Sequence, residues 1–596
     1  MSTAYSQPDF KDAPERLTGL LVFFMLLAGL CVMPLDADSV KAYAFISLLH
    51  MGLCCIVWAH TALLLYYLFT PRRRRVLRNS LNLCQLILGV LCSGLMAGTL
   101  FHAINPQFFW LSLLLALIIG VLGVTDLGNY IRSRLPVASA THHRLWNSAV
   151  IFFVAMFSLV CISTVLLLSP GASVHPISFT DAFFMSVSAA SNTGLCTVSV
   201  PKTFTWLGQT VLIVDMQIGT VSVMTFNYYV LLMVGQRLTA GDSISLSPNM
   251  DQGNVRNVPE LIRSVIFVSL FVELVGAVCL YFCWKGDPGI PQDTASLIGY
   301  SLFHSISTFC NFGLTLFPDN FVTASIHDAY LVQTVMMVLI IAGTMGFGVY
   351  WEVITRARRR LHGQRNPLRW STHSWFVLRV MLVVTVLGTI VLTLAGWLEP
   401  SGHEHSFFSS FWDGLWNSVG RSTGINRTDH AEYGPVYKLL MTLLMFIGGN
   451  PAGTGGGVFA PVFAICVLEV FRVLRGEQDL VIYNRCITPS TVARAVSTLI
   501  LGTMWVFGTS VALLLLEPAI ASPKNGALDM IFLSVSAFST AGHTLTSPGV
   551  LSDASKFLLA FSMMLGRVGM FTTILIFIRQ RSAAPLRYPQ TRLPLT

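Results

Sequence analysis

The chain has 596 residues, of which 54% are hydrophobic and only 11% are charged. Because soluble domains carry about 25% charged residues, this composition excludes a soluble globular protein. The net charge of +9 does not indicate a nucleic acid partner, since the Lys and Arg residues form short clusters between apolar runs. Such clusters are typical of the cytoplasmic loops of a membrane protein. The sequence therefore predicts a polytopic protein embedded in the lipid bilayer.

About twelve apolar stretches approach or exceed the length of about 18 residues that a membrane helix needs. The first four lie close together, at 17–35, 42–70, 79–101 and 107–131. Eight more widely spaced stretches follow, near 146–169, 204–235, 258–284, 327–354, 372–397, 434–471, 490–517 and 553–578. Basic clusters follow every second stretch, so the positive-inside rule predicts that both termini are cytoplasmic. We expect a multi-pass protein of the cell inner (plasma) membrane.

A short phrase recurs between the later stretches. Three copies resemble one another closely: SVSAASNTG at Ser186–Gly194, SISTFCNFG at Ser305–Gly313 and SVSAFSTAG at Ser534–Gly542. A looser and shorter copy, SVGRSTG, lies at Ser418–Gly424. The glycines that end these phrases are nearly evenly spaced, and each phrase lies between two long apolar stretches. The chain therefore predicts one unit repeated four times: a span, a short semi-apolar segment, a glycine loop and a second span.

These units give the predicted fold, an all-α polytopic membrane protein with four parallel M1–P-loop–M2 repeats around a central pore, preceded by about four extra transmembrane helices. The repeats are parallel because every unit begins and ends on the cytoplasmic side. The predicted boundaries are 1–145 for the N-terminal extra transmembrane helices, 146–240, 258–360, 372–475 and 490–580 for the four repeats, and 581–596 for a cytoplasmic tail.

The semi-apolar segments, such as Asp181–Ala190, have only about ten residues and cannot span a bilayer. We interpret them as re-entrant helices that return through the glycine loops. Non-helical backbone at membrane depth is tolerated only where it is buried in protein or lines a wet cavity. Glycine can turn its carbonyl inward at no steric cost, and rings of carbonyls replace the hydration shell of an ion in potassium filters. The four loops therefore predict a path for a dehydrated monovalent cation, although small residues also serve plain helix packing.

With these residues, the chain resembles the Trk/Ktr/HKT superfamily of potassium transporters, closest to its Ktr-type membrane subunits, over about 146–580. The resemblance rests on the four loops and on three further segments: FHSISTF at Phe303–Phe309, FIGGNPAGTGGG at Phe446–Gly457 and GRVGMFT at Gly566–Thr572. It implies single-file uptake of potassium, K+ as the transported ion, and no organic cofactor in this chain. It also implies a homodimer on a cytosolic ring of nucleotide-binding regulatory subunits.

The candidate ion-binding residues end each of the four phrases. They are Asn192, Thr193, Gly194, Asn311, Phe312, Gly313, Ser422, Thr423, Gly424, Thr540, Ala541 and Gly542. In plant relatives a Ser in the first loop goes with sodium preference, and the position here is Gly194, so the resemblance favours potassium.

The candidate gate is a run of glycines inside the sixth of the later stretches, together with one intramembrane arginine. The residues are Gly448, Gly449, Gly453, Gly455, Gly456, Gly457 and Arg567. Six glycines and one proline should break a helix, and we interpret the run as a mobile loop under the filter, the alternative being close helix packing. Arg567 is costly in lipid. We expect it to face the pore, as a barrier to cations or as an anchor for the loop, unless it snorkels to the interface.

Other functions remain open. The chain could be a sodium-permeable member of the same superfamily, or the pore-like subunit of a potassium-pumping P-type ATPase. A polytopic membrane enzyme is not expected, because the chain contains no HExxH, GxSxG or P-loop lysine motif. A secondary transporter would more often show two inverted halves than four parallel units.

Several acidic residues lie in or beside the apolar stretches. Asp181, Asp413 and Asp529 lie near the outer starts of re-entrant helices, where they suit the positive end of a helix dipole and could also attract cations. Asp215 and Glu273 are expected to be buried against partners, because a charge in lipid is costly.

Overall fold

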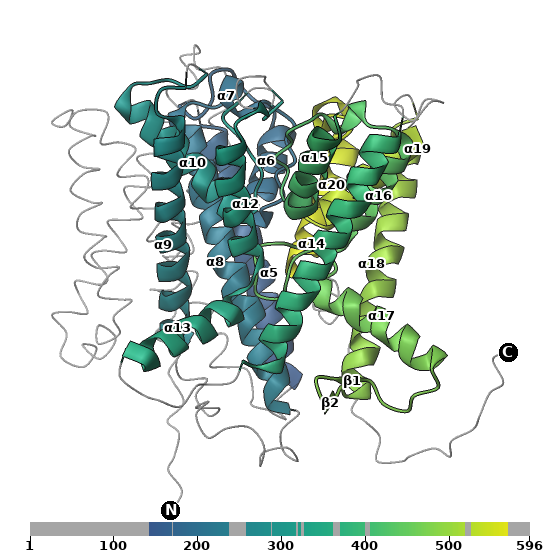
Figure 1. Cartoon of the computed structure of the whole chain (residues 1–596). Coiled ribbons are helices and arrows are strands. Elements are labelled where there is room, and N and C mark those ends of the chain that lie inside the picture. Colours follow the sequence, from purple (N-terminus) through teal and green to yellow (C-terminus); the bar gives the residue numbers. More distant parts are fainter. Residues whose placement is uncertain are drawn as a thin grey trace, which may run out of the picture.

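The computed structural model describes most of the chain between His142 and Gly569 (Figure 1). The described residues are 142–169, 171–237, 258–287, 289–317, 320–322, 327–361, 370–399, 406–518 and 526–569. The four early apolar stretches and the predicted tail at 581–596 lie outside the described residues.

Four successive parts of the described chain show the same order of elements: a long helix, a short helix, a glycine loop and a second helix. The first part contains α5 (His142–Leu167), α6 (Phe179–Ser191), α7 (Val200–Thr203) and α8 (Trp206–Arg237). The second contains α9 (Val258–Trp284), α10 (Thr294–Phe309), α12 (Tyr330–Thr344) and α13 (Phe347–Leu361).

The third and fourth parts follow the same order with additional short elements. The third contains α14 (Thr372–Leu398), α15 (Phe407–Val419), the 3-10 turns η4 (Gly420–Ser422) and η5 (His430–Glu432), α16 (Pro435–Phe446) and α17 (Ala460–Leu474). A two-stranded antiparallel hairpin follows, β1 (Val481–Ile482) and β2 (Arg485–Cys486). The fourth contains α18 (Pro489–Leu516), α19 (Gly526–Phe538), η6 (Pro548–Val550) and α20 (Asp553–Val568).

Four helices within the described ranges are long and apolar enough to cross a membrane, and a fifth span results if the bent pair α12 and α13 is counted as one. Figure 1 shows the long helices running side by side, with α13 and α17 lying across their lower ends. Large apolar side chains on these helices are exposed, for example Phe267 at 69%, Leu382 at 65% and Phe507 at 69%. An apolar outer surface of this kind suits contact with lipid rather than with water.

The short helices lie in the upper half of the molecule, beside the long ones (Figure 1). Helix α6 packs against α5 and α8, α10 against α9 and α12, α15 against α14, and α19 against α18 and α20. With 13 residues in α6, α15 and α19 and 16 in α10, none of them can span a bilayer. Two begin at a side-chain cap, because Ser178 accepts from the backbone N–H of Asp181 and Asp293 accepts from that of Ser296.

The stretch predicted as one span at 327–354 is instead bent by 95° between α12 and α13. The bend lies at Gly346, which has a φ of +87°. Immediately after it, the backbone N–H of Phe347 donates to the carbonyl oxygen of Ala452 at 2.9 Å. The helix therefore turns where it meets the glycine-rich run, and the apolar pattern of the sequence gave no sign of this long-range contact.

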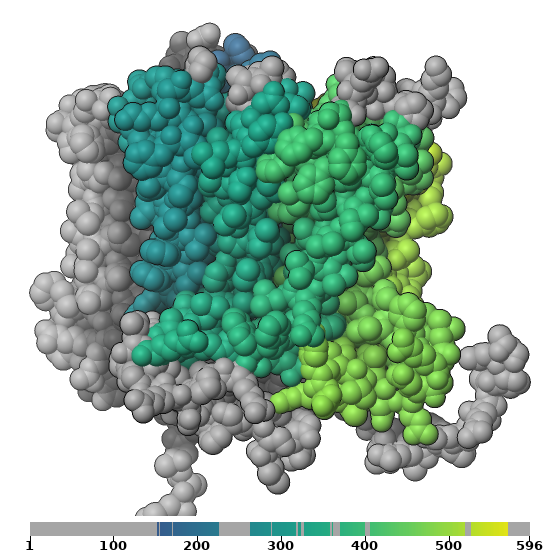
Figure 2. Space-filling view, in the orientation of Figure 1, coloured from purple at the N-terminus to yellow at the C-terminus, as the bar shows by residue number. Residues whose placement is uncertain are grey.

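Packing closes the molecule around the short helices. Helix α20 of the fourth part contacts α6 of the first, and α16 contacts α19. Figure 2 shows one face as a continuous packed surface, with the segment from α17 through the hairpin at its lower right corner.

Candidate functional site

The four predicted glycines meet in one closed ring. A Cβ atom placed on Gly194 would lie 1.9 Å from the carbonyl oxygen of Phe312, and one on Gly313 would lie 2.1 Å from the backbone nitrogen of Gly424. A Cβ on Gly424 would lie 2.8 Å from the carbonyl oxygen of Gly542, and one on Gly542 would lie 2.3 Å from the carbonyl oxygen of the residue before Gly194. Each glycine therefore touches the backbone of the next loop, and these close approaches require a residue without a side chain.

Three of the four loops share one backbone conformation. One or two residues after the end of the short helix, each of these loops has a residue in the left-handed region: Asn192 with φ +53°, Asn311 with φ +54° and Thr540 with φ +50°. The glycine two residues later also has a positive φ, between +80° and +87°. In each loop the residue between them donates its N–H to a carbonyl five residues back, at 2.9 Å. This pattern closes the end of a helix without leaving its carbonyls unpaired.

The third loop reaches the ring by a different path. It passes through the η4 turn, and Thr423 then has an extended backbone with φ −139°. None of its described residues has a positive φ. The shorter phrase of this loop nevertheless brings Gly424 between Gly313 and Gly542.

The polar side chains of the predicted filter residues brace the loops. Asn192 donates from Nδ2 to the Thr220 hydroxyl and, at 2.9 Å, to the carbonyl oxygen of Cys310 in the second loop. Asn311 donates to the Thr454 hydroxyl. The amide nitrogens of Asn192 and Asn311 are therefore engaged, whereas Asn192 Oδ1 has no hydrogen-bond partner among the described residues. The contacts between neighbouring ring glycines are made by backbone atoms.

The remaining predicted filter residues divide into apolar and hydroxyl-bearing side chains. The side chains of Phe312 and Ala541 lie in apolar clusters, so they offer only backbone atoms to the ring. Ser422 donates to Asn311 Oδ1 at 3.4 Å, and the Thr540 hydroxyl accepts from the backbone N–H of Gly456 at 2.9 Å. The side chain of Thr423 is buried.

The six glycines of the predicted gate lie between α16 and α17, directly against the fourth loop of the ring. The run closes on itself through the N–H of Gly448, which donates to the carbonyl oxygen of Val458 at 2.9 Å. A Cβ on Gly456 would lie 2.4 Å from the Thr540 hydroxyl oxygen, and a Cβ on either Gly449 or Gly455 would lie 3.0 Å from the Cα of the other. Residues 447–459, the glycine-rich segment, are therefore packed against the fourth loop. This close contact is made by backbone atoms, and a side chain at Gly456 would prevent it.

Arg567 joins this segment from α20. It is 1% exposed, and its Nη1 donates to the carbonyl oxygen of Thr454. Beside it, the N–H of Gly457 donates to the carbonyl oxygen of Gly566 at 3.2 Å. Its Nε and Nη2 have no hydrogen-bond partner within the described part of the chain. The structure thus brings Arg567 and the six predicted glycines together. Among these glycines, Gly453 lies against α12, since a Cβ there would lie 2.7 Å from the carbonyl oxygen of Thr344.

Two buried residues of this site escaped the sequence reasoning. Arg421 is 2% exposed and donates to the carbonyl oxygens of Ser418 at 2.8 Å and Ile447 at 3.1 Å. It ties the third loop to the start of the glycine-rich segment. The available signal was an arginine inside a phrase whose sister copies have none.

His543, the second missed residue, directly follows Gly542 and is fully buried. Its Nε2 donates to the carbonyl oxygen of Gly420 at 3.0 Å, and its Nδ1 lies 2.6 Å from Asn426 Oδ1 and 3.0 Å from His430 Nε2. The residue therefore links the third and fourth loops.

The two intramembrane acids are both buried, as expected, but a hydrogen-bond partner is present only for Glu273, since neither carboxylate oxygen of Asp215 has one among the described residues. Asp215 is 1% exposed and Glu273 is 2% exposed. Glu273 Oε1 accepts from the thiol of Cys310, with an S–O distance of 3.8 Å, so the Cys310 side chain is packed behind the second loop. Among the described residues, neither acid forms a hydrogen bond to a ring glycine.

Comparison with known proteins gives consistent similarities. The family described as TrkH, cation transport protein, matches residues 137–585. The Ktr system potassium uptake protein B of Vibrio alginolyticus is 29% identical over 434 residues, which cover 72% of this chain and 90% of that protein. The protein of the same name in Bacillus subtilis is 28% identical over 440 residues, which cover 73% of this chain and 94% of that protein.

A solved structure is similar over most of its length. The crystal structure of the potassium transporter TrkH from Vibrio parahaemolyticus aligns with a TM-score of 0.59 at 15% identity, covering 84% of this chain and 98% of that one. At this identity the likeness shows the fold alone. It confirms the predicted helical membrane fold at that level.

Proposed function

The chain belongs to the TrkH family of cation transport proteins, and we propose that it takes up potassium through a selectivity filter formed by its four glycine loops. Membership of the superfamily predicted from the sequence is thereby confirmed. In the proposal, the four parts of the chain are parallel M1–P-loop–M2 repeats around one central pore. The ion passes through the ring of Gly194, Gly313, Gly424 and Gly542.

The observation that carries this proposal is the closed ring. Backbone carbonyls from residues 193, 312 and 542 lie at the contacts between successive loops. Carbonyl dipoles grouped in this way can replace the water around a weakly hydrated cation such as K+. The relatives named as potassium uptake proteins support the same choice of ion.

In the proposed mechanism the glycine-rich segment at 447–459 is the gate. It is buried against the ring and hydrogen-bonded to the second and fourth loops through Thr454 and Gly456. The positive charge of Arg567 stands beside the same segment and opposes cations while the segment is in place. Opening would then require Arg567 to release the carbonyl of Thr454.

The proposal includes a location and partners. The protein acts in the cell inner (plasma) membrane with both termini in the cytoplasm, as a homodimer controlled by a cytosolic ring of nucleotide-binding subunits. The described chain is occupied by helices and loops of the pore, so nucleotide control would come from a separate subunit.

The test is ion uptake in cells that lack their own potassium importers, with and without this chain. We expect saturable potassium uptake that sodium affects little. Saturable sodium uptake instead would favour the sodium-permeable alternative and contradict the potassium filter. Uptake that requires an ATPase subunit would favour the pump alternative.

A further inference from the structure

The third loop is shaped by different forces from the other three. In the first, second and fourth loops, the backbone is shaped by left-handed residues at 192, 311 and 540 and by left-handed glycines, and hydrogen bonds of the three left-handed side chains add to this. The described residues of the third loop include no positive φ. It is held instead by its own 3-10 turn, in which the N–H of Thr423 donates to the carbonyl oxygen of Gly420 at 2.8 Å, and by the side chains that surround it.

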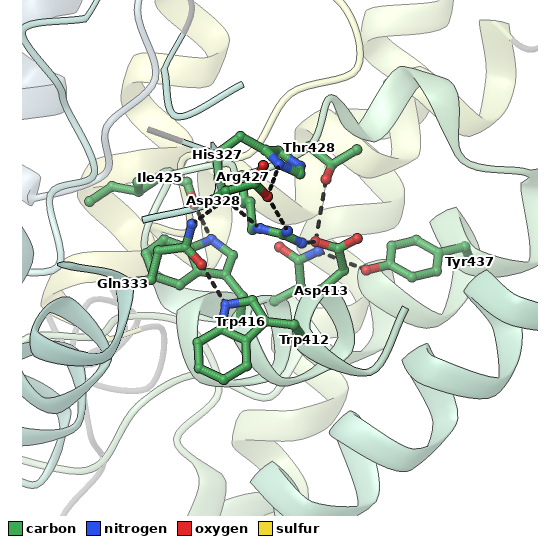
Figure 3. A network of polar contacts seen from close by, with 11 residues as sticks. His327, Asp328, Gln333, Trp412, Asp413, Trp416, Ile425, Arg427, Thr428 and Tyr437 are labelled. Atoms are coloured by element: carbon green, nitrogen blue, oxygen red, sulfur yellow. Dashed lines mark hydrogen bonds and ion pairs between the residues drawn. The ribbon is translucent and has the colours of Figure 1, made fainter. Parts of the chain in front are cut away.

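Figure 3 shows a polar network around Arg427, which lies three residues after Gly424. Arg427 is 1% exposed. Its Nη1 donates to Asp413 Oδ1, and its Nε donates to the carbonyl oxygen of His327 at 3.1 Å. Its Nη2 lies 3.8 Å from Asp328 Oδ1. One guanidinium thus joins the third loop to α15 and to the segment just before α12.

Asp413 is the buried counterpart on α15, with 2% exposure. Its Oδ1 also accepts from the hydroxyl of Thr428 at 3.3 Å. Removing two charges from water is costly, and the attraction between them repays that cost only with good geometry and additional hydrogen bonds. Here additional hydrogen bonds accompany the pair, which joins the residues after Gly424 to the re-entrant helix.

Neighbouring bonds hold the same stretch of backbone. Trp416 Nε1 donates to the carbonyl oxygen of Ile425 at 3.0 Å. Asn320 Nδ2 donates to the carbonyl oxygen of Gly424 at 3.0 Å. Together with the ion pair, these bonds hold residues 424–428 in place, and the bond from Asn320 is made to the ring glycine Gly424 itself.

The corresponding acids of the other re-entrant helices are engaged differently. Asp181 pairs with Lys556 of α20 at 2.9 Å, so its partner comes from another part of the fold. Asp529 accepts from the Thr546 hydroxyl at 3.3 Å, a neutral bond. Only at Asp413, among these three, does an ion pair hold the return segment of the same loop.

From this contrast we infer that Asp413 and Arg427 are positioning residues that set the shape of the third filter loop, and thereby the preference of the filter for potassium over sodium. The inference deepens the proposed function and rests on it. Selectivity is a difference between two affinities, so a small displacement of one loop affects the two ions unequally. The pair acts through the backbone of Gly424 and does not itself touch the ion.

The test is the ion dependence of thermal unfolding for the purified full-length chain, which needs no regulatory partner. Ligands that bind the folded state raise its unfolding temperature, so titrations with KCl and NaCl at constant ionic strength give a half-saturating concentration for each ion. For the double variant Asp413→Asn/Arg427→Gln, we expect the sodium-to-potassium ratio of these concentrations to fall about tenfold. Removing both charges together avoids the unpaired buried charge that Asp413→Asn alone would leave.

Two further variants separate positioning from stability. Arg427→Lys keeps the charge but not the planar fork of donors, and we expect it to restore part of the ratio. Glu469→Gln breaks an ion pair with Arg472 that lies outside the site, at the end of α17, and we expect it to leave the ratio unchanged. A folded double variant that keeps the full wild-type ratio would overturn this inference and leave the proposed function standing. A wild-type chain with no preference for potassium would contradict the proposed filter and this inference with it.

Discussion

At the scale of single residues, the ring explains why its members are glycines. At Gly194 the space for a Cβ is occupied by the carbonyl oxygen of Phe312, 1.9 Å away, and the φ of +87° is one that other residues rarely adopt. Any side chain at this position must displace the second loop. A substitution there therefore changes the distance between two sets of carbonyls, on which ion choice depends in the proposed filter.

We predict that Gly194→Ser lowers the potassium-to-sodium uptake ratio about tenfold. The measurement is competition between the two ions in cells without their own importers. Gly299→Ser is the matched control, because a Cβ at Gly299 meets nothing within 4 Å. An unchanged ratio in Gly194→Ser, with normal amounts in the membrane, would show that Gly194 is not part of the filter.

Arg567 offers a second test at this scale, because its charge and its bond to Thr454 have separable effects. If the charge is the barrier, Arg567→Gln should raise potassium flux without an activating partner about tenfold, whereas Arg567→Lys should keep it low. If the bond to the carbonyl oxygen is the anchor, both variants should raise the flux, since a lysine cannot reproduce the guanidinium geometry. Flux equal to that of the wild type in both variants would exclude either role.

At the scale of elements, the glycine-rich segment is the part of the site with most connections. It is joined to the second loop, the fourth loop, α12 and α20 by hydrogen bonds of Asn311, Thr540, Gly343 and Gly566. Arg421 adds a bond from the third loop to Ile447. A movement of this segment therefore breaks bonds to the second, third and fourth loops at once, as the proposed gate requires.

Deleting Gly453–Gly455 removes Thr454 and its bonds to Asn311 and Arg567. We expect this variant to raise the basal potassium flux about tenfold, measured as tracer uptake at saturating potassium. The control is deletion of Tyr483–Asn484 in the turn between β1 and β2, far along the chain from the ring. A flux no greater than that of the wild type would rule out a gating role for the segment.

At the scale of the whole molecule, the outer faces of α9, α14 and α18 carry exposed apolar side chains. In the proposed homodimer, part of such a surface meets a second copy and the rest meets lipid. We predict that the chain purified in mild detergent has twice its own mass of 65.4 kDa, as measured by light scattering after subtraction of the detergent. A protein that is monomeric throughout a dilution series would contradict the dimer.

The amino-acid sequence alone determined the class of protein, the family and the identity of the ring glycines. The class of protein and the ring glycines follow from the low charge content, the length of the apolar stretches and a phrase repeated at even spacing. The family follows from the resemblance of the four loops and three further segments to known transporters. The break at Gly448–Gly457 was also readable, because glycine and proline interrupt a helix wherever they cluster.

The tertiary structure decided the rest, because it depends on contacts between residues from 26 to 123 positions apart. The bend at Gly346, the separate backbone path of the third loop, and the roles of Arg421, Arg427 and His543 all arise from such contacts. A lone arginine in an apolar sequence signals only that a partner must exist. The partner of each arginine, a carbonyl oxygen or a carboxylate, is decided only when the four parts of the chain pack around the ring.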